Sequence, residues 1–433
     1  MTVGFGWLAI VRLGLVQASL GAIVMLATSL LNRLMVVEYG LAAAIPAGLV
    51  AWHYAVQLSR PAWGQGSDRG LKRTPWIHAG MALLGLGALA AVDATILLGS
   101  ARGWGIALAI AGFTMIGAGV GAAGTSLLAL LASGVAPQRR AAAAAVTWIM
   151  MVAGIVIAAG TAGALLDPFS PSRLALVASG VVAAALLVTV LATWRLEAQA
   201  LPREGPSAAV PDFRAALAEI MADTAARRFT LFIFVSMLAY SMQDLILEPF
   251  AGLVFGMSPG QSTSLAGQQH GGVLAGMIVA GIGGSAFAGR LPGELRSWIA
   301  LGCLGSALAL AGLVMGARVG PGWPLAANVF FLGFANGIFA VAAIGAMMGL
   351  AGAGERTREG VRMGVWGAAQ AIAFGLGGLA GALGVDATRR LIGHDAQAFA
   401  LVFAIEGGLF LIAAGLALRS PRPQTRQAGV AGA

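Results

Sequence analysis

The sequence predicts an all-α membrane protein with twelve transmembrane helices in two pseudo-symmetric six-helix bundles. Hydrophobic residues make up 59% of the 433 residues and charged residues only 10%, whereas soluble domains are about one-quarter charged. The chain also contains twelve apolar runs, each close to the roughly 20 residues that a spanning helix needs. Finally, the first and seventh runs end in similar polar patterns, which indicates an internal repeat.

The apolar runs follow one another with short polar connections. We place them at residues 8–31, 41–59, 75–99, 104–132, 141–166, 173–194, 229–255, 270–289, 297–316, 323–350, 361–385 and 396–418. The chain contains 64 glycines, which a helix tolerates in lipid because no water competes for its hydrogen bonds. We therefore expect the glycines to permit close helix packing.

The longest connection divides the chain into three regions. Residues 1–195 form an N-terminal six-helix bundle, residues 196–228 a cytoplasmic linker, and residues 229–433 a C-terminal bundle with a cytoplasmic tail. In the linker, apolar residues at spacings of four and three would share one face of a helix. We expect a short amphipathic helix on the membrane surface; its apolar residues are Phe213, Leu217 and Ile220.

The repeat is clearest at the ends of the first and seventh spans. Residues 32–39 read Asn-Arg-Leu-Met-Val-Val-Glu-Tyr, and residues 243–250 read Gln-Asp-Leu-Ile-Leu-Glu-Pro-Phe. A weaker echo relates Asp167 after the fifth span to Asp386 after the eleventh. Two six-span halves of this kind are the plan of major facilitator transporters, which enclose a central cavity.

The basic residues predict the orientation. Nineteen of the 26 lie in even-numbered connections or the C-terminal tail, and six lie in odd-numbered connections. Because basic residues favour the cytoplasmic side, both termini are predicted to be cytoplasmic. Membrane orientation also explains the net charge of +9 without a nucleic-acid partner.

A glycine-rich basic turn between the second and third spans resembles the facilitator signature. Residues 64–73 read Gly-Gln-Gly-Ser-Asp-Arg-Gly-Leu-Lys-Arg. The resemblance implies a cytoplasmic gate in which an Asp and an Arg lock helix ends together. The residues concerned are Arg60, Gly64, Asp68, Arg69 and Arg73. The second-half copy at residues 289–293 lacks the Asp, so a symmetric pair of gates is not expected.

Longer motifs resemble the PucC family of purple phototrophic bacteria. They lie at residues 32–38, 53–57, 60–61, 66–68 and 73–77 in the first half, and at 242–250, 254–256 and 364–370 in the second. The resemblance implies a factor that assists assembly of light-harvesting antenna complexes and binds or delivers bacteriochlorophyll. It also implies antenna polypeptides as partners, with the reaction-centre core complex and pigment-synthesis enzymes as further candidates. The implied location is the bacterial inner, intracytoplasmic photosynthetic membrane.

Ionisable side chains inside a membrane are costly, so each needs a partner or a purpose. Asp244 and Glu248 would share one face of the seventh span, where one is protonated or a cation is near. Because Arg33 is the counterpart of Asp244 in the repeat, we expect an ion pair between them. Glu38 and Glu248 would be its outer companions. The alternative is a structural clamp without a role in substrate handling.

A candidate pigment site lies on the second span. His53, Gln57 and Arg60 share a helix face, and a neutral imidazole is a suitable axial ligand for the magnesium of bacteriochlorophyll. The alternative is a histidine that is hydrogen-bonded to a neighbouring helix. The pigment or substrate candidates are Trp52, His53, Tyr54, Gln57, Gln243, Asp244 and Glu248.

The sequence argues against an enzyme and against nucleotide cofactors. No Gly-Lys pair occurs, so no phosphate-binding loop for ATP is expected. Residues 119–124 match the glycine pattern of NAD sites, but they lie inside an apolar run without a preceding strand. The alternative function is a proton-coupled secondary transporter of an amphipathic substrate, with Asp244 or Glu248 as the coupling acid.

Overall fold

The chain is helical throughout the residues that the computed structural model describes, and no strand occurs among them. These are residues 5–60, 63, 67, 72–135, 139–197, 222, 224–286, 295–352 and 359–419. Every predicted apolar run overlaps a helix or consecutive helices, but the eighth, predicted at residues 270–289, corresponds to α12, which already begins at Pro259. Nine of the described spans are long and apolar enough to cross a membrane. The prediction of an all-helical membrane protein is confirmed.

The first half begins with a long helix that contains a π-helical segment. α1 (Trp7–Met25), the π-helix η1 (Leu26–Leu31) and α2 (Asn32–Val37) follow one another without a break. The other helices of this half are α3 (Ala44–Val56), the 3-10 turn η2 (Gln57–Ser59), α5 (Thr74–Leu97), α6 (Arg102–Gly134), α7 (Arg140–Leu166) and α8 (Pro171–Thr193).

The second half begins with an interrupted helix. α10 (Thr224–Asp244) ends two residues before α11 (Leu247–Phe255) begins. The other elements are α12 (Pro259–Ala286), α13 (Leu295–Val319), the 3-10 turn η5 (Gly320–Gly322), α14 (Leu325–Gly352), α15 (Glu359–Ile392) and α16 (Asp395–Arg419).

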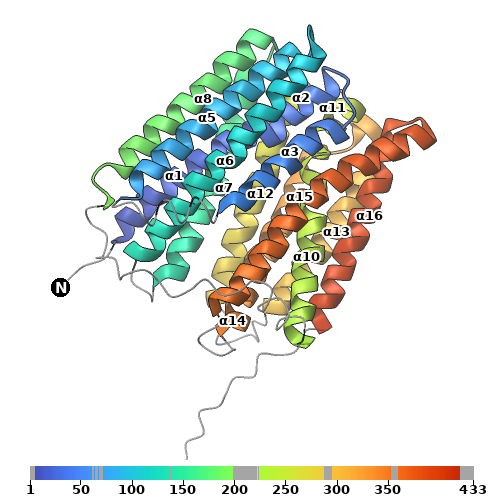
Figure 1. Ribbon diagram of the computed structural model, residues 1–433. Helices are drawn as coiled ribbons and strands as arrows, with labels where there is room; N and C mark the ends of the chain where they lie inside the picture. Colours follow the sequence, from blue (N-terminus) through green and yellow to red (C-terminus); the bar gives the residue numbers. More distant parts are fainter. Residues whose placement is uncertain are drawn as a thin grey trace, which may run out of the picture.

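The helices form two bundles that lie side by side (Figure 1). In the first, α1 packs against α7 and α8, and α5 against α6; in the second, α10 packs against α15 and α16, and α13 against α14 and α16. Two helix pairs make the main contacts between the bundles, α7 with α12 and α3 with α15. A pseudo-twofold axis relates these two pairs to each other, because α7 is the counterpart of α15 and α3 is the counterpart of α12 in the two halves.

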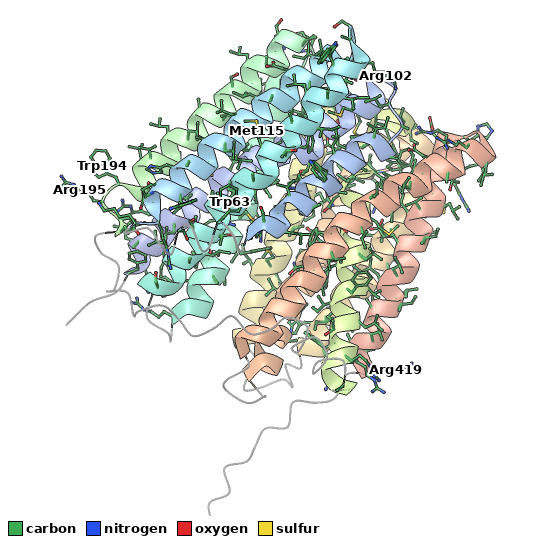
Figure 2. All side chains as sticks on the ribbon, viewed as in Figure 1. Trp63, Arg102, Met115, Trp194, Arg195 and Arg419 are labelled. Atoms are coloured by element: carbon green, nitrogen blue, oxygen red, sulfur yellow. The ribbon has the colours of Figure 1, made fainter. Side chains whose placement is uncertain are left out.

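The two ends of the bundles differ in their basic residues. Figure 2 shows Arg102 at one end and Arg195 and Arg419 at the other. We call the end that carries Arg102 the outer end; it is formed by the connections at residues 38–43, 98–101, 167–170, 256–258, 320–324 and 393–394. The charge pattern predicts that it faces away from the cytoplasm. The expected amphipathic linker helix, and Gly64, Asp68 and Arg69, lie outside the described residues.

Small residues bring α7 and α12 into backbone contact. A Cβ atom built on Gly163 would lie 2.8 Å from the carbonyl oxygen of Gly260 and 2.3 Å from Oγ of Ser264. A Cβ on Gly260 would lie 2.5 Å from the carbonyl oxygen of Gly163. Such close approach gives dispersion contact between helices in lipid, where the hydrophobic effect offers none.

Gly163→Ala should therefore loosen the joint between the halves. Overpacking costs typically about 1–3 kcal/mol, so we expect a lower melting temperature for the detergent-purified variant. Gly160→Ala is the matched control, because a Cβ at Gly160, on the same helix, would meet nothing within 4 Å. Equal melting temperatures for the two variants would contradict the close contact.

Candidate functional site

The interruption between α10 and α11 follows from Pro249, the third residue of α11. Proline lacks an N–H group, and its ring clashes with the carbonyl group four residues earlier. That carbonyl belongs to Leu245, which lies in the turn between the two helices. The seventh span is therefore not the continuous helix that the sequence analysis assumed, and the expectation that Asp244 and Glu248 share one uninterrupted helix face was wrong.

The carbonyl group that Pro249 frees is satisfied from the other half of the molecule. Nδ2 of Asn32 donates a hydrogen bond of 2.7 Å to the carbonyl oxygen of Leu245. Asn32 is the first residue of α2 and directly follows the π-helical segment η1. π-Helical bulges and broken spans both occur preferentially at functional sites, and here both lie next to the contact between Asn32 and Leu245.

Arg33 also connects the two halves. Its side chain is almost fully buried and forms an ion pair with Glu38 at 2.5 Å. Its other terminal nitrogen donates a hydrogen bond of 2.7 Å to the carbonyl oxygen of Met257, in the second half. Arg33 additionally interacts electrostatically with Glu248.

The expected ion pair between Arg33 and Asp244 is not formed. Arg33 belongs to α2, beyond the π-helical segment, and it pairs with Glu38 near the outer end. Asp244 instead ends α10 on the other side of the helix break. The acidic residue of the second half that interacts with Arg33 is Glu248. The helix break therefore brings Glu248, and not Asp244, next to Arg33.

A cavity of about 90 Å³ lies between the halves. Helices of both bundles line it, including η1, α3, α10, α11, α12 and α15. Its polar lining residues are Thr28, Ser29, Tyr54, Ser241, Asp244, Glu248, Gln269 and His270. We call it the central cavity. A cavity of this size has room for water molecules.

The two carboxylates of the central cavity have different surroundings. Glu248 is 2% exposed and accepts a hydrogen bond from Ser29 of the first half. It also accepts one of 3.5 Å from Thr263 of α12. Asp244, by contrast, forms no hydrogen bond or ion pair with any residue in the described part of the chain.

The structure divides the predicted pigment and substrate residues into two groups. Tyr54, Asp244 and Glu248 meet at the central cavity. His53, on α3, does not line it and is only 1% exposed. Nδ1 of His53 lies 2.7 Å from the carbonyl oxygen of Val50, so Nδ1 carries the proton and Nε2 is the nitrogen that could coordinate a metal.

The remaining predicted residues lie apart from the cavity. Gln57 is buried and accepts a hydrogen bond from Arg60. Trp52 is 47% exposed and donates a hydrogen bond of 2.8 Å to Oγ1 of Thr114. Gln243 is fully buried, and its side chain finds no hydrogen-bond partner among the described residues.

Arg73, one of the predicted gate residues, holds helix ends together within the first half. Its backbone N–H donates a hydrogen bond of 2.6 Å to Glu197, which follows α8. Its guanidinium donates one of 2.9 Å to Oγ of Ser133, near the end of α6. Arg73 therefore ties three spans together at the end of the bundle opposite Arg102.

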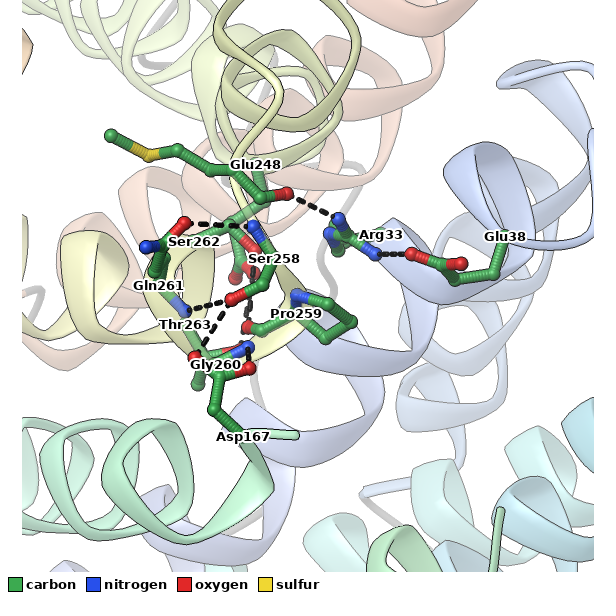
Figure 3. Close-up of polar contacts among 11 residues, drawn as sticks. Arg33, Glu38, Asp167, Glu248, Ser258, Pro259, Gly260, Gln261, Ser262 and Thr263 are labelled. Atoms are coloured by element: carbon green, nitrogen blue, oxygen red, sulfur yellow. Dashed lines mark hydrogen bonds and ion pairs between the residues drawn. The ribbon is translucent and has the colours of Figure 1, made fainter. Parts of the chain in front are cut away.

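Two aspartates that the sequence analysis treated only as a repeat signal close the outer end. Asp167 follows α7 and accepts hydrogen bonds from Oγ of Ser258, at 2.7 Å, and from the N–H of Gly260, at 3.3 Å (Figure 3). Ser258 in turn starts α12 by a capping box with Gln261: its Oγ accepts from the Gln261 N–H, and its own N–H donates to the Gln261 side chain. Asp167 thus binds the N-terminus of a helix in the other half.

Asp386 makes the equivalent contact in the opposite direction. It lies on α15 and accepts hydrogen bonds of 3.1 Å and 2.8 Å from the N–H groups of Ala43 and Ala44, at the start of α3. A carboxylate at a helix N-terminus satisfies free amides and interacts favourably with the helix dipole. Each half therefore places an aspartate on a helix start of the other half. We call these two contacts the outer clasps.

Comparison with known proteins places the chain among membrane proteins of phototrophic bacteria. Residues 30–424 match the family described as PUCC protein. The chain is 52% identical over 412 residues to the "Bacteriochlorophyll synthase 44.5 kDa chain" of Rhodobacter capsulatus, covering 95% of each chain. It is 30% identical to "Protein PucC" of the same species, covering 94% of this chain and 91% of that one.

Solved transporter structures share the fold. The chain resembles a bacterial homologue of the human lysosomal transporter Spinster in an inward-facing conformation, with a TM-score of 0.72, 15% identity and 96% coverage of both chains. It resembles a D-xylose–proton symporter with the same TM-score and identity, covering 96% of this chain and 98% of that one. At this identity the likeness shows the major facilitator fold alone.

Arg33 should matter more for stability than its partner Glu38. Removing one member of an ion pair is costly when it leaves a buried charge without a partner. Arg33→Met removes the hydrogen bond to Met257 and leaves the buried Glu248 without its positive neighbour. Glu38→Gln removes an acid that is 36% exposed and leaves Arg33 beside Glu248. Thermal unfolding should show a larger loss for Arg33→Met than for Glu38→Gln. The reverse order would contradict the central position of Arg33.

Removal of both outer clasps should let the outer end open. Loss of a helix cap costs about 0.5–2 kcal/mol, so we expect the Asp167→Ala/Asp386→Ala variant to separate the halves. Spin labels at Gly103 and Val319, on opposite halves of the outer end, report the distance in a Cys303→Ser background. The distribution should become longer and broader. Asp395→Ala is the control, since Asp395 pairs with Arg389 inside one half; the same change in this control would contradict the account.

Proposed function

The chain belongs to the PUCC family, and we propose that it is a membrane assembly factor for bacterial light-harvesting antenna complexes. The family match across residues 30–424 carries this proposal. The proposed partners are the antenna polypeptides, with the reaction-centre core complex and pigment-synthesis enzymes as further candidates. The proposed location is the bacterial inner, intracytoplasmic photosynthetic membrane, with both chain termini in the cytoplasm.

We further propose that the protein binds or delivers bacteriochlorophyll. The name of the relative that is 52% identical includes this pigment, which supports the proposal. The interior does not fit the macrocycle in this conformation: pockets for drug-sized ligands measure about 300–1,000 Å³, whereas the central cavity measures about 90 Å³. His53, at 1% exposure, is equally closed to a macrocycle. A pigment site therefore requires either the lipid-facing surface or separation of the halves.

The lipid-facing surface suits small membrane polypeptides as partners. Large apolar side chains project from the outside of the bundles, with Leu176 74% exposed and Leu308 66% exposed. Such a surface is normal for a membrane protein and does not identify a partner by itself. It is, however, where a polypeptide inserted in the same membrane would meet the chain. We propose that the protein acts there without catalysing a reaction.

A proton-coupled secondary transporter of an amphipathic substrate is the second candidate function. The observation in its favour is the central cavity between two pseudo-symmetric halves, with Asp244 and Glu248 in its wall. Transporters of this architecture bind substrate and coupling ions between their repeats, next to interrupted helices. The likeness to transporter structures supports the fold on which this candidate depends.

The protein purified from a pigment-making host should carry bacteriochlorophyll and retain antenna polypeptides. An absorption spectrum and a protein gel of the detergent-purified sample check both. A colourless protein without antenna polypeptides would contradict the assembly proposal. If pH-dependent substrate flux is lost in Asp244→Asn, the transporter is favoured instead.

The same spectrum of two histidine variants locates the pigment. His53→Ala removes the candidate axial ligand, and His78→Ala is the control because His78 is bonded to Oγ1 of Thr193 at 2.7 Å. Since His53 is closed to a macrocycle, we expect both variants to retain the pigment. Loss of pigment in His53→Ala alone would place the site on α3 and show that the helices around it open.

A further inference from the structure

We infer that the central cavity binds one small monovalent cation, either Na⁺ or hydronium, beside Asp244. The two ions share their chemistry, a compact single positive charge surrounded by oxygen atoms. The inference requires neither pigment nor antenna polypeptides, so its test is independent of the proposed function.

The balance of charge around the cavity favours a bound cation. Glu248 has a positive neighbour, because Arg33 interacts with it electrostatically. Asp244 has none: it interacts electrostatically with Tyr54, Tyr240 and Glu406, and no basic side chain in the described part of the chain pairs with it. An ionised carboxylate inside a membrane is costly without a compensating charge. Asp244 is therefore either protonated or needs one positive charge beside it.

Glu406 increases this need. It lies on α16 and is fully buried, and neither of its carboxylate oxygens has a hydrogen-bond partner among the described residues. Buried polar groups without partners are rare, and an unobserved ion or water is one of the usual reasons. Since Glu406 and Asp244 interact with each other, a cation beside Asp244 lowers the cost of both.

The cavity is also lined by polar side chains that lack a hydrogen-bond partner among the described residues. Gln269 of α12 is 4% exposed, lines the cavity, and forms no hydrogen bond within the described residues. His270 next to it also lines the cavity, and its Nδ1 lies 2.9 Å from the carbonyl oxygen of Ala266. Nε2 of His270 is consequently an acceptor. A carboxylate, an amide and an imidazole thus line the same small cavity.

The backbone around the cavity is irregular in both halves. The repeat relates the first span to the seventh, and both spans line the cavity. The first span has its π-helical segment there, and the seventh span is interrupted there. In many secondary transporters, interrupted helices near the centre of the membrane form the sites of coupling ions. The cavity, of about 90 Å³, has room for one small cation.

The charge and the ligands favour a monovalent ion over a divalent one. Ca²⁺ takes about six to eight oxygen ligands, often from several carboxylates. Within the described ranges, no group of three or more His, Cys, Asp or Glu side chains is placed to hold a metal ion. Asp244 is the carboxylate in the cavity wall that has no positive neighbour among the described residues, so one positive charge would balance it.

Protonation of the site must be considered together with the other ionisable groups that face Asp244. These are Tyr54 on α3, Tyr240 on α10, Glu248 on α11, His270 on α12 and Glu406 on α16, with Arg33 of α2 beyond Glu248. A response to acid is assigned to Asp244 only if the Asp244→Asn substitution removes it.

The test is the thermal stability of the full-length, detergent-purified protein as Na⁺ replaces choline at constant ionic strength and pH. A ligand that binds the folded state raises the melting temperature in a saturable way. We expect Na⁺ to stabilise the wild type, and K⁺ to do so less. Asp244→Asn should lose the response, and Gln269→Ala should weaken it. Asp93→Asn, which changes an exposed acid of α5, should keep it.

A second arm distinguishes the two ions. If hydronium is the occupant, Na⁺ has no effect, and lowering the pH in sodium-free choline buffer stabilises the wild type but not Asp244→Asn. If both the Na⁺ and the acid responses are the same in wild type and Asp244→Asn, the inference is overturned. Should Asp244→Asn fail to fold, binding of radioactive ²²Na⁺ and the acid response are compared between wild type and Gln269→Ala. Equal results for these two proteins would also overturn the inference.

Discussion

Much of the arrangement between the two halves follows from one proline in the seventh span. Pro249 cannot continue the helix, and it leaves the carbonyl group of Leu245 without its helical partner. In lipid such a group costs several kcal/mol unless another donor reaches it, and Asn32 of the other half supplies that donor at 2.7 Å. The break also separates Asp244 from Glu248. The carboxylate of Glu248 accepts a hydrogen bond from Ser29 and interacts with Arg33, whereas the carboxylate of Asp244 lines the central cavity without a partner among the described residues.

The other hydrogen bonds between described residues of the two halves lie between the central cavity and the outer end. Hydrogen bonds between described residues of the two halves extend from Ser29 and Asn32 through Arg33 to the outer clasps of Asp167 and Asp386. The clasps need close helix approach, which Gly163 and Gly260 provide. The outer end is consequently closed by polar contacts whose partners lie on opposite halves, and the central cavity is correspondingly small. A large flat pigment has no place inside this conformation.

The sequence predicted the fold better than the site. Long apolar runs and the similar ends of the first and seventh spans are local patterns, and they were sufficient for twelve helices and two halves. The partner of Arg33 could not be derived in this way, because the pairing of repeat positions ignores the helix break that Pro249 causes. Pro249 itself was a readable signal. Asp167 and Asp386 were seen as equivalent, but only the folded structure brings each to a helix start of the other half. Gln269 and His270 carry no motif, since their role depends on the helices that face them.

The family match supports our proposal of a membrane factor that acts on its neighbours in the bilayer. The most direct measurement is the absorption spectrum of photosynthetic membranes from the source organism after deletion of the gene, beside the pigments extracted from the same cells. The account predicts that bacteriochlorophyll is still made and extracted, while the absorption bands of an antenna complex are lost and return with the gene. Normal antenna bands in the deletion strain, or the disappearance of bacteriochlorophyll itself, would contradict it.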